Sequence, residues 1–268
     1  MVSDSCKKRF GKIMMEEMEL VAQEEIAPRI YSMILKGEMV AQMLPGQFLH
    51  IRVPDGSKLL RRPISISEID PETQTCRLIY RIEGGGTAIF SQLPIGSKLS
   101  VMGPQGNGFD LTNLGQGQKA LIIGGGIGVP PLVQVAKQLH EQGVDVEVVV
   151  GFATKEAVIL EEVLSQVAHV TVTTDDGTYG TKGYVSTVID QMDQEFDAIY
   201  SCGAPGMLKY VNTKFHDHPR AYISMESRMA CGMGACYACV VHLENESQAA
   251  NKRVCEDGPV FETGTIVM

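Results

Sequence analysis

The spacing of apolar residues divides the chain into three zones, and the first extends to about residue 114. Short β-prone segments, such as residues 30–35 and 77–82, alternate there with turns rich in glycine and proline. Even spacing of this kind, without a helical period, is typical of an antiparallel β-barrel. We therefore expect residues 1–114 to form a small barrel domain, with a loose tail at the extreme N-terminus.

At Lys119 the apolar period changes, and a second zone, residues 115–223, begins. It alternates strands with helices; the strands are expected at 120–123, 144–150, 170–174, 198–201 and up to 222–223, and the helices at 130–141, 155–167, 184–192 and from about residue 205. This alternation predicts a doubly wound parallel sheet. Such sheets bind ligands at the carboxyl ends of their strands, where the strand order reverses.

The third zone, residues 224–268, is too short to build a core without help from a metal site or a neighbour. We expect a strand at 240–243, a polar turn at 244–252 and a return strand at 253–255. The predicted fold class is therefore β plus α/β: an antiparallel β-barrel, a doubly wound parallel-sheet domain and a small C-terminal region.

Charge and hydropathy exclude two classes of partner. The formal net charge is −9 and the pI is about 5.2, which argues against a general nucleic-acid binder. No secretory signal is evident, and apolar runs such as residues 120–123 are too short to span a bilayer. An odd total of seven cysteines fits a reducing compartment, so we expect a cytoplasmic protein without a membrane anchor.

Four cysteines near the C-terminus carry the most specific chemical signal. Cys231, Cys236, Cys239 and Cys255 have the C-x4-C-x2-C spacing plus one later cysteine that is typical of a plant-type [2Fe-2S] cluster. Glycines between the first two cysteines let the backbone turn its N–H groups toward sulfur. Structural zinc and two disulfides are the alternatives, although only Cys236 and Cys239 form a C-x2-C pair.

A glycine-rich turn lies between the first strand and the first helix of the second zone. Gly126, Gly128 and Pro131 form a G-x-G-x-x-P pattern. Backbone N–H groups at a helix N-terminus attract a pyrophosphate, and glycine permits its close approach. The segment is thus a candidate dinucleotide site, and the alternative is a tight connection without a ligand.

The barrel zone holds two further phosphate-binding candidates. Arg62, Pro63, Ile64 and Ser65 place a bidentate cation and a hydroxyl on one strand, unless this strand is simply a solvated charged edge. Downstream, Tyr80 and Arg81 offer an aromatic face and a cation, and residues 84–87 offer a backbone cradle. Together with the glycine-rich turn, these features indicate two nucleotide cofactors.

The order of these motifs, followed by Cys-Gly-Ala-Pro-Gly-Met at 202–207, resembles the ferredoxin reductase superfamily of flavoproteins. Ile64 stands where the superfamily's R-x-Y-S motif has a tyrosine that stacks on the flavin. Arg62-Pro63-Ile64-Ser65, the Asp-Asp-Gly segment after residue 174 and residues 225–239 are most similar to the electron-transfer subunits of two-subunit, NAD-linked dihydroorotate dehydrogenases.

The resemblance implies an FAD in the barrel, in contact with Arg62, Pro63, Ile64, Ser65, Ile79, Tyr80, Arg81, Gly86 and Thr87. Asp175 and Asp176 follow the third strand of the parallel domain, where a carboxylate would accept from a ribose hydroxyl and repel a 2′-phosphate. We therefore expect NAD rather than NADP, unless the pair is a plain turn. Cys202 either touches the nicotinamide or fills space.

The expected function is electron transfer in pyrimidine biosynthesis: from the FMN of a dihydroorotate dehydrogenase catalytic subunit, through the [2Fe-2S] cluster and FAD, to NAD⁺. The partner would supply the general base, since no catalytic pair appears here, and two copies of each subunit are expected. One alternative is the small subunit of another NAD(P)H-linked reductase, of the sulfide dehydrogenase or bifurcating transhydrogenase type. Another is a zinc-stabilised binding subunit without redox activity.

Overall fold

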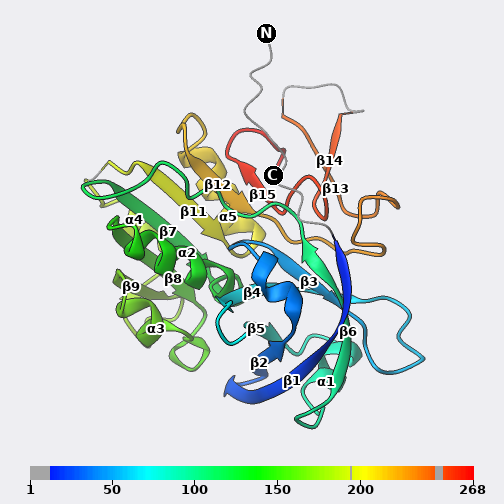
Figure 1. Cartoon of the computed structure of the whole chain (residues 1–268). Helices are drawn as coiled ribbons and strands as arrows, with labels where there is room; N and C mark the ends of the chain where they lie inside the picture. The colour runs from blue at the N-terminus through cyan, green and yellow to red at the C-terminus, as the bar shows by residue number, and fades with distance from the viewer. Residues whose placement is uncertain (1–12, 194, 245–249) are drawn as a thin grey trace.

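The computed structural model describes residues 13–193, 195–244 and 250–268 of the chain. The tail expected at the extreme N-terminus lies outside these residues, as do residues 245–249 of the polar turn. Figure 1 shows the N-terminal barrel and a large sheet side by side, with the C-terminal strands β13, β14 and β15 against their upper edge.

The first zone is a closed antiparallel barrel, as predicted, with strand order β1-β2-β5-β4-β3-β6. Its strands are β1 (Met14–Ala27), β2 (Ile30–Lys36), β3 (Phe48–Ile51), β4 (Arg62–Asp70), β5 (Thr75–Arg81) and β6 (Lys98–Gln105). Leu20, Leu49 and Leu78 are among the fully buried side chains of its interior. Two short helices were not expected from the sequence, η1 (Glu38–Gln42) and α1 (Gly85–Phe90).

The second zone is the predicted parallel sheet, and its strand order is β10-β9-β8-β7-β11-β12-β15. The strands are β7 (Lys119–Gly125), β8 (Asp145–Phe152), β9 (His169–Thr174), β10 (Thr181–Lys182), β11 (Ala198–Cys202), β12 (Ala221–Ser224) and β15 (Val260–Glu262); the helices are η2 (Gly126–Gly128), α2 (Pro130–Glu141), η3 (Lys155–Ala157), α3 (Glu161–Ser165), α4 (Val185–Ile189) and α5 (Pro205–Lys214). The strand order reverses beside β7, which places the ligand crevice at its carboxyl end.

The helix predicted over residues 155–167 is wrong in extent. The structure has η3 and α3 instead, because Leu160 between them adopts a left-handed backbone conformation with φ 65°. That conformation cannot continue a right-handed helix. Ile159 and Leu164 are both buried, so tertiary packing rather than helical periodicity decides the local path. The helix expected at 184–192 is likewise reduced to α4.

The third zone forms the expected hairpin, β13 (Val240–His242) with β14 (Asn251–Arg253), and Cys255 lies in the turn after β14 rather than on the strand. The zone then returns to the large sheet, where β15 pairs antiparallel with β12. Its buried cysteines, Cys239 and Cys255, share one apolar cluster with Phe48 of the barrel and Ile123 of the sheet. The C-terminal zone therefore obtains its core from both neighbours.

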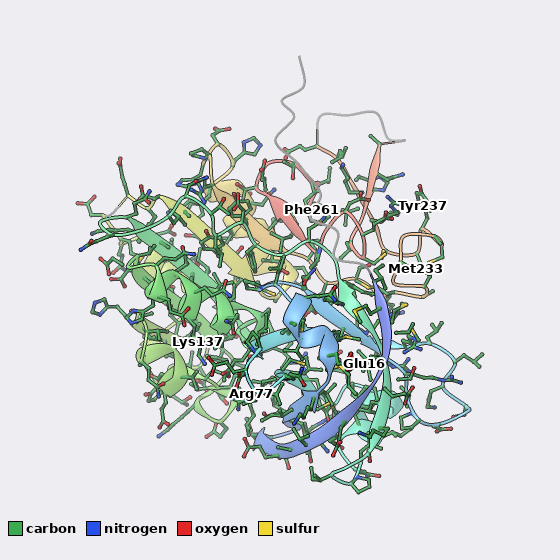
Figure 2. The ribbon with its side chains drawn as sticks, in the orientation of Figure 1. Glu16, Arg77, Lys137, Met233, Tyr237 and Phe261 are labelled. Atoms are coloured by element: carbon green, nitrogen blue, oxygen red, sulfur yellow. The ribbon has the colours of Figure 1, made fainter. Side chains whose placement is uncertain are left out.

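A polar contact joins the barrel to helix α2. The carboxylate of Glu68 on β4 accepts from Arg77 at 3.0 Å and from Lys137 of α2 at 2.7 Å. Burial alone would raise the pKa of Glu68, but these two cations outweigh it and lower the pKa. Arg77 and Lys137 lie close together at the junction of the two units in Figure 2.

Candidate functional site

A cleft of about 1370 Å³ opens where the barrel meets the carboxyl ends of β7, β8 and β11. This is the crevice that the strand order predicts. Six residues expected at a cofactor site line it: Arg62, Pro63, Arg81, Gly126, Gly128 and Asp175. The structure thus brings candidates from two zones to one cavity.

The barrel side of the cleft pairs Arg62 with the first turn of α1. A Cβ at Gly86 would stand 2.5 Å from Nε of Arg62, so only glycine lets the guanidinium lie against this turn. Thr87 caps the same turn, because its hydroxyl oxygen accepts from the N–H groups of Glu83 and Gly84. Arginine beside free helical N–H groups suits a phosphate.

Arg81 and Arg61 are both held by other groups in this structure. Arg81 forms an ion pair with Glu83, and both line the cleft. Arg61 donates to the backbone oxygen of Ser100 at 2.6 Å and to the hydroxyl oxygen of Ser100 at 3.1 Å. Among the described residues, the hydrogen bonds of Arg62 go to the backbone oxygens of its neighbours Leu60 and Arg61, so its guanidinium can turn toward a ligand.

The sheet side of the cleft has the geometry of a dinucleotide cradle. Gly126 has φ +53° with no atom near its missing side chain, so it is open to the cavity. A Cβ at Gly128 would stand 2.6 Å from the backbone of Cys202, so this position must be glycine. Helices α2 and α5 both begin here, and their N-termini favour an anion.

The two neighbouring aspartates lie in different surroundings. Asp175 lines the cleft, whereas the Asp176 carboxylate accepts from the backbone N–H of Thr178 at 3.0 Å and from its hydroxyl at 2.7 Å. These hydrogen bonds lower the pKa of Asp176. Asp176 therefore stabilises the turn, and Asp175 is the one of the two that lines the cleft.

Several predicted cofactor residues do not line the cleft. The prediction that Tyr80 offers an aromatic face to a cofactor is wrong, because this residue is only 3% exposed. Its ring stacks on Tyr31 inside the barrel, and its hydroxyl donates to Gln23. Ile64 packs against the same interior, which also accounts for an aliphatic residue at that position. Barrel register, which turns alternate side chains inward, decides these orientations.

The remaining predicted residues support the cleft from behind. Ile79 and Cys202 belong to the apolar cluster beneath it, Pro131 is buried in the first turn of α2, and Ser65 lies opposite Phe48 of β3. Burial raises the pKa of the Cys202 thiol, and the side chain is 2% exposed. Cys202 accordingly packs as a small apolar residue in this structure.

Glu226 and Arg228, to which the sequence motifs give no role, also line the cleft in the segment after β12. Glu226 is open to the cavity, yet the surrounding protein desolvates its carboxyl group and raises its pKa. Both residues fall within the stretch that carried the family resemblance, so their position before Cys231 was the available signal.

The four cysteines come together, and they do so as two pairs. Cys231 contacts Cys236, and Cys239 contacts Cys255. Backbone N–H groups point at the sulfurs: Gly234 donates to Cys255 at 3.2 Å, and Met233 donates to Cys231 at 3.4 Å. Burial would raise the pKa of Cys231, but the Met233 N–H and the Cys236 thiol outweigh it and lower the pKa to about 7.

The paired arrangement of the cysteines can be compared with the [2Fe-2S] cluster, the structural zinc site and the disulfides considered above. Among the described residues, no three His, Cys, Asp or Glu side chains form a group that could hold a single metal ion. Two thiol pairs instead suit a [2Fe-2S] cluster, in which each iron takes two thiolates. The six cysteines within the described part of the chain are all free.

The cysteine loop has a buried side and an exposed side. Cys239 and Cys255 are 2% and 3% exposed, whereas Cys236 is exposed to solvent. Next to it, Met233 and Tyr237 are 51% and 60% exposed and lie at the outer edge of the molecule in Figure 2. Arg253 holds this loop by donating to the backbone oxygen of Gly234 at 3.0 Å.

Comparison with known families follows the three zones. Residues 17–109 match an oxidoreductase FAD-binding domain and residues 122–213 an oxidoreductase NAD-binding domain. Residues 226–267 match the iron-sulfur cluster binding domain of dihydroorotate dehydrogenase B.

Similar proteins cover nearly the whole chain. A dihydroorotate dehydrogenase B (NAD⁺) electron transfer subunit from Streptococcus mutans is 68% identical over 96% of this chain and 99% of its own length. The same-named subunit from Enterococcus faecalis is 46% identical over 94% of this chain and 98% of its own length. Among solved structures, a chain of an NADH-dependent reduced ferredoxin-NADP oxidoreductase is 28% identical, with a TM-score of 0.83 over 94% of this chain and 90% of its own.

The helices within the described residues include none that is long and apolar enough to cross a membrane.

Proposed function

The chain belongs to the electron-transfer subunits of dihydroorotate dehydrogenase B, and we propose which of its residues bind each cofactor. It is a flavin and iron-sulfur oxidoreductase subunit with FAD-, NAD- and cluster-binding parts. We assign FAD to residues 1–114, NAD to 115–223 and the [2Fe-2S] cluster to 224–268. The two thiol pairs beside a cleft lined by both nucleotide-binding zones are the observation that carries the assignment.

Cys231, Cys236, Cys239 and Cys255 are the proposed cluster ligands, and the N–H groups of Met233 and Gly234 support them. Arg62 and the first turn of α1 hold the FAD phosphates, with Pro63 and Arg81 along the same wall. Open space at Gly126 and the N-termini of α2 and α5 fit the NAD pyrophosphate. The donor set therefore fits all three groups.

When bound, FAD supplies the conversion between single electrons from the cluster and hydride for NAD⁺. The protein's own contribution is to hold and separate the sites. Gly128 brings the α2 turn against the end of β11, and Asp175 faces the position of an adenosine ribose. A carboxylate there selects NAD over NADP, because it repels a 2′-phosphate.

Electrons enter at the exposed side of the cysteine loop, from the FMN of a catalytic subunit that carries the general base for dihydroorotate. Cys236 is exposed between Met233 and Tyr237, and two exposed apolar side chains beside a ligand suit a protein partner. The proposed assembly holds two copies of each subunit and acts in the cytoplasm in pyrimidine biosynthesis.

The test is Cys236→Ser in the two-subunit complex. We expect loss of iron and sulfide and loss of dihydroorotate-dependent NAD⁺ reduction, while NADH oxidation by artificial dyes is retained, because the dyes take electrons from FAD. Cys76→Ala is the matched control, since this thiol is 1% exposed within the barrel. Full iron and sulfide content in Cys236→Ser would remove Cys236 from the ligand set.

A further inference from the structure

Two buried polar side chains on the barrel are left without hydrogen-bond partners. His50 in the middle of β3 is 0% exposed, and Gln105 at the end of β6 is 1% exposed. Both ring nitrogens of His50 and both amide atoms of Gln105 lack a hydrogen-bond partner among the described residues. Buried polar groups are nearly always paired, so four such atoms in one place indicate a group that completes them.

Both side chains point at the cysteine loop. A Cβ at Gly232 would stand 2.3 Å from Nδ1 of His50 and 2.9 Å from Oε1 of Gln105. Gly232 directly follows Cys231 and has φ +68°, so this position needs glycine both for its backbone and for the two side chains that abut it. The backbones of Arg61 and Cys231 both lie close to the imidazole but not in hydrogen-bonding geometry.

His50 also neighbours the strand that carries the flavin motif. In the pairing of β3 with β4, His50 lies directly opposite Pro63, and Pro63 lines the cleft. Directly opposed residues of an antiparallel pair place their side chains on the same face. On β3, Phe48 shares this face and packs against the buried cysteines, whereas Leu49 points into the barrel. His50 therefore lies between the cleft and the cysteine loop.

We propose that His50 and Gln105 direct N–H donors toward the sulfur atoms of the [2Fe-2S] site and thereby raise its reduction potential. This inference rests on the cluster assignment made above and adds two positioning residues from the barrel to it. Neutral imidazole and a primary amide each offer at least one N–H donor. Donors aimed at cluster sulfurs favour the reduced, more negative state and so raise the potential.

The arrangement has a consequence for how the zones cooperate. Among the described residues, N–H donors to sulfur also come from the cysteine zone itself, for example from Met233, Gly234 and Cys255. His50 and Gln105 come from the FAD-binding barrel, so the flavin domain would help to set the potential of the group that exchanges electrons with it.

The experiment is an anaerobic redox titration of the two-subunit complex, followed by electron paramagnetic resonance of the reduced cluster. His50→Leu removes both ring nitrogens at similar volume. We expect it to retain iron and sulfide but to shift the oxidised-to-reduced ratio at a fixed potential about tenfold toward the oxidised form, which corresponds to about 59 mV lower for one electron. His50→Asn, whose amide nitrogen can occupy the place of Nδ1, should return the potential toward that of the wild type.

Gln47→Leu is the matched control. Gln47 is also buried, but both its amide nitrogen and its amide oxygen have partners: it donates to the backbone oxygen of Gly106 at 2.8 Å and accepts from the backbone N–H of Leu44 at 2.8 Å. It should leave the potential and the resonance spectrum unchanged.

The outcomes separate this inference from the proposed function. A wild-type complex without iron and sulfide would overturn the proposed function itself. Full cluster content with an unshifted potential in His50→Leu would overturn only the role of His50 and Gln105. If His50→Leu fails to retain the cluster, Gln105→Leu decides: a lower potential supports the inference, and the wild-type potential overturns it.

Discussion

At the scale of residues, identical side chains that are neighbours in the sequence make different contacts. Asp175 and Asp176 share a charge and a turn, yet only Asp175 faces the cleft, because Asp176 accepts two hydrogen bonds from Thr178. The same division separates Arg62, which lies beside the α1 turn, from Arg61, which is held by Ser100. In each pair, one side chain is more strongly held by neighbouring groups than the other.

This division predicts the behaviour of two charge-neutralising variants. Asp175→Asn should reduce the preference for NADH over NADPH about tenfold, because it removes the carboxylate that repels the 2′-phosphate. Asp176→Asn keeps the oxygen that accepts from Thr178 and should leave the preference unchanged. The measurement is kcat/KM for both nucleotides with an artificial acceptor. An equal loss of preference in the two variants would contradict the assignment of Asp175.

The sequence could predict those parts of the site that depend on local patterns, and it could not predict those that depend on contacts between distant segments. The cysteine spacing and the glycine-rich turn are local patterns, and in the structure Cys231 contacts Cys236 while Gly126 and Gly128 line the cleft. The direction of Tyr80 depends on the register of a closed barrel, which no local pattern contains. The contact of His50 with Gly232 joins segments that are far apart in the sequence, and it was therefore missed.

At the scale of elements, β4 joins the barrel to the nucleotide domain. Its Glu68 binds Arg77 within the barrel and Lys137 on α2, and Gln134 of α2 accepts from the backbone N–H of Ile69 at 2.9 Å. These contacts fix α2 relative to β4, whose first residues line the cleft. They therefore stabilise the geometry of the site from behind.

The charge of Glu68 makes this contact dependent on pH. The folded-state pKa lies below the ordinary 4.5, so the stabilisation is fully present above about pH 4.5 and is lost as the pH falls through the folded value. Glu68→Gln should lower the free energy of unfolding by about 2 kcal/mol at pH 7. The loss should shrink toward zero in acid, where the wild-type carboxyl is also neutral.

Urea unfolding of both proteins between pH 3 and pH 7 measures this effect. Glu72→Gln is the control, because Glu72 is exposed in the turn that follows β4. A difference for Glu68→Gln that stays constant across this range would contradict the role of the charge.

The elements also show where periodicity is an incomplete guide. Alternating strands and helices predicted the parallel sheet, since βαβ units carry their own pattern. The antiparallel return of β15 to β12 was not predicted, because Val260–Glu262 is short and its partner lies in another zone. The break at Leu160 was missed for a related reason: nothing in its neighbours marks a left-handed residue there.

At the scale of the whole molecule, the three zones form one path from an exposed loop to a nucleotide cleft. The exposed end is marked by Cys236 and by Met233 and Tyr237, and the inner end by the cleft between barrel and sheet. Buried Cys239 and Cys255 lie between them, packed against Phe48 of the barrel. One side of the cysteine loop is thus available to a partner, and the other is fixed to this chain.

Association with the catalytic subunit should depend on the exposed side. Met233→Glu places a charge where an apolar contact is expected and should weaken complex formation at least about tenfold. Ile95→Glu is the control, since Ile95 is likewise exposed, at 56%, but lies in the turn between α1 and β6. Figure 1 shows α1 at the lower edge of the molecule, away from β13 and β14. Titration calorimetry or analytical ultracentrifugation measures the affinity, and equal affinities for both variants would place the interface elsewhere.

The most direct test of the account is an anaerobic visible spectrum of the purified chain, with iron, sulfide and flavin analysis, before and after addition of NADH. We predict one FAD, two irons and two sulfides per chain, with the absorbance of both groups bleached by NADH. Stoichiometric zinc without flavin, or a flavin that NADH does not reduce, would contradict it.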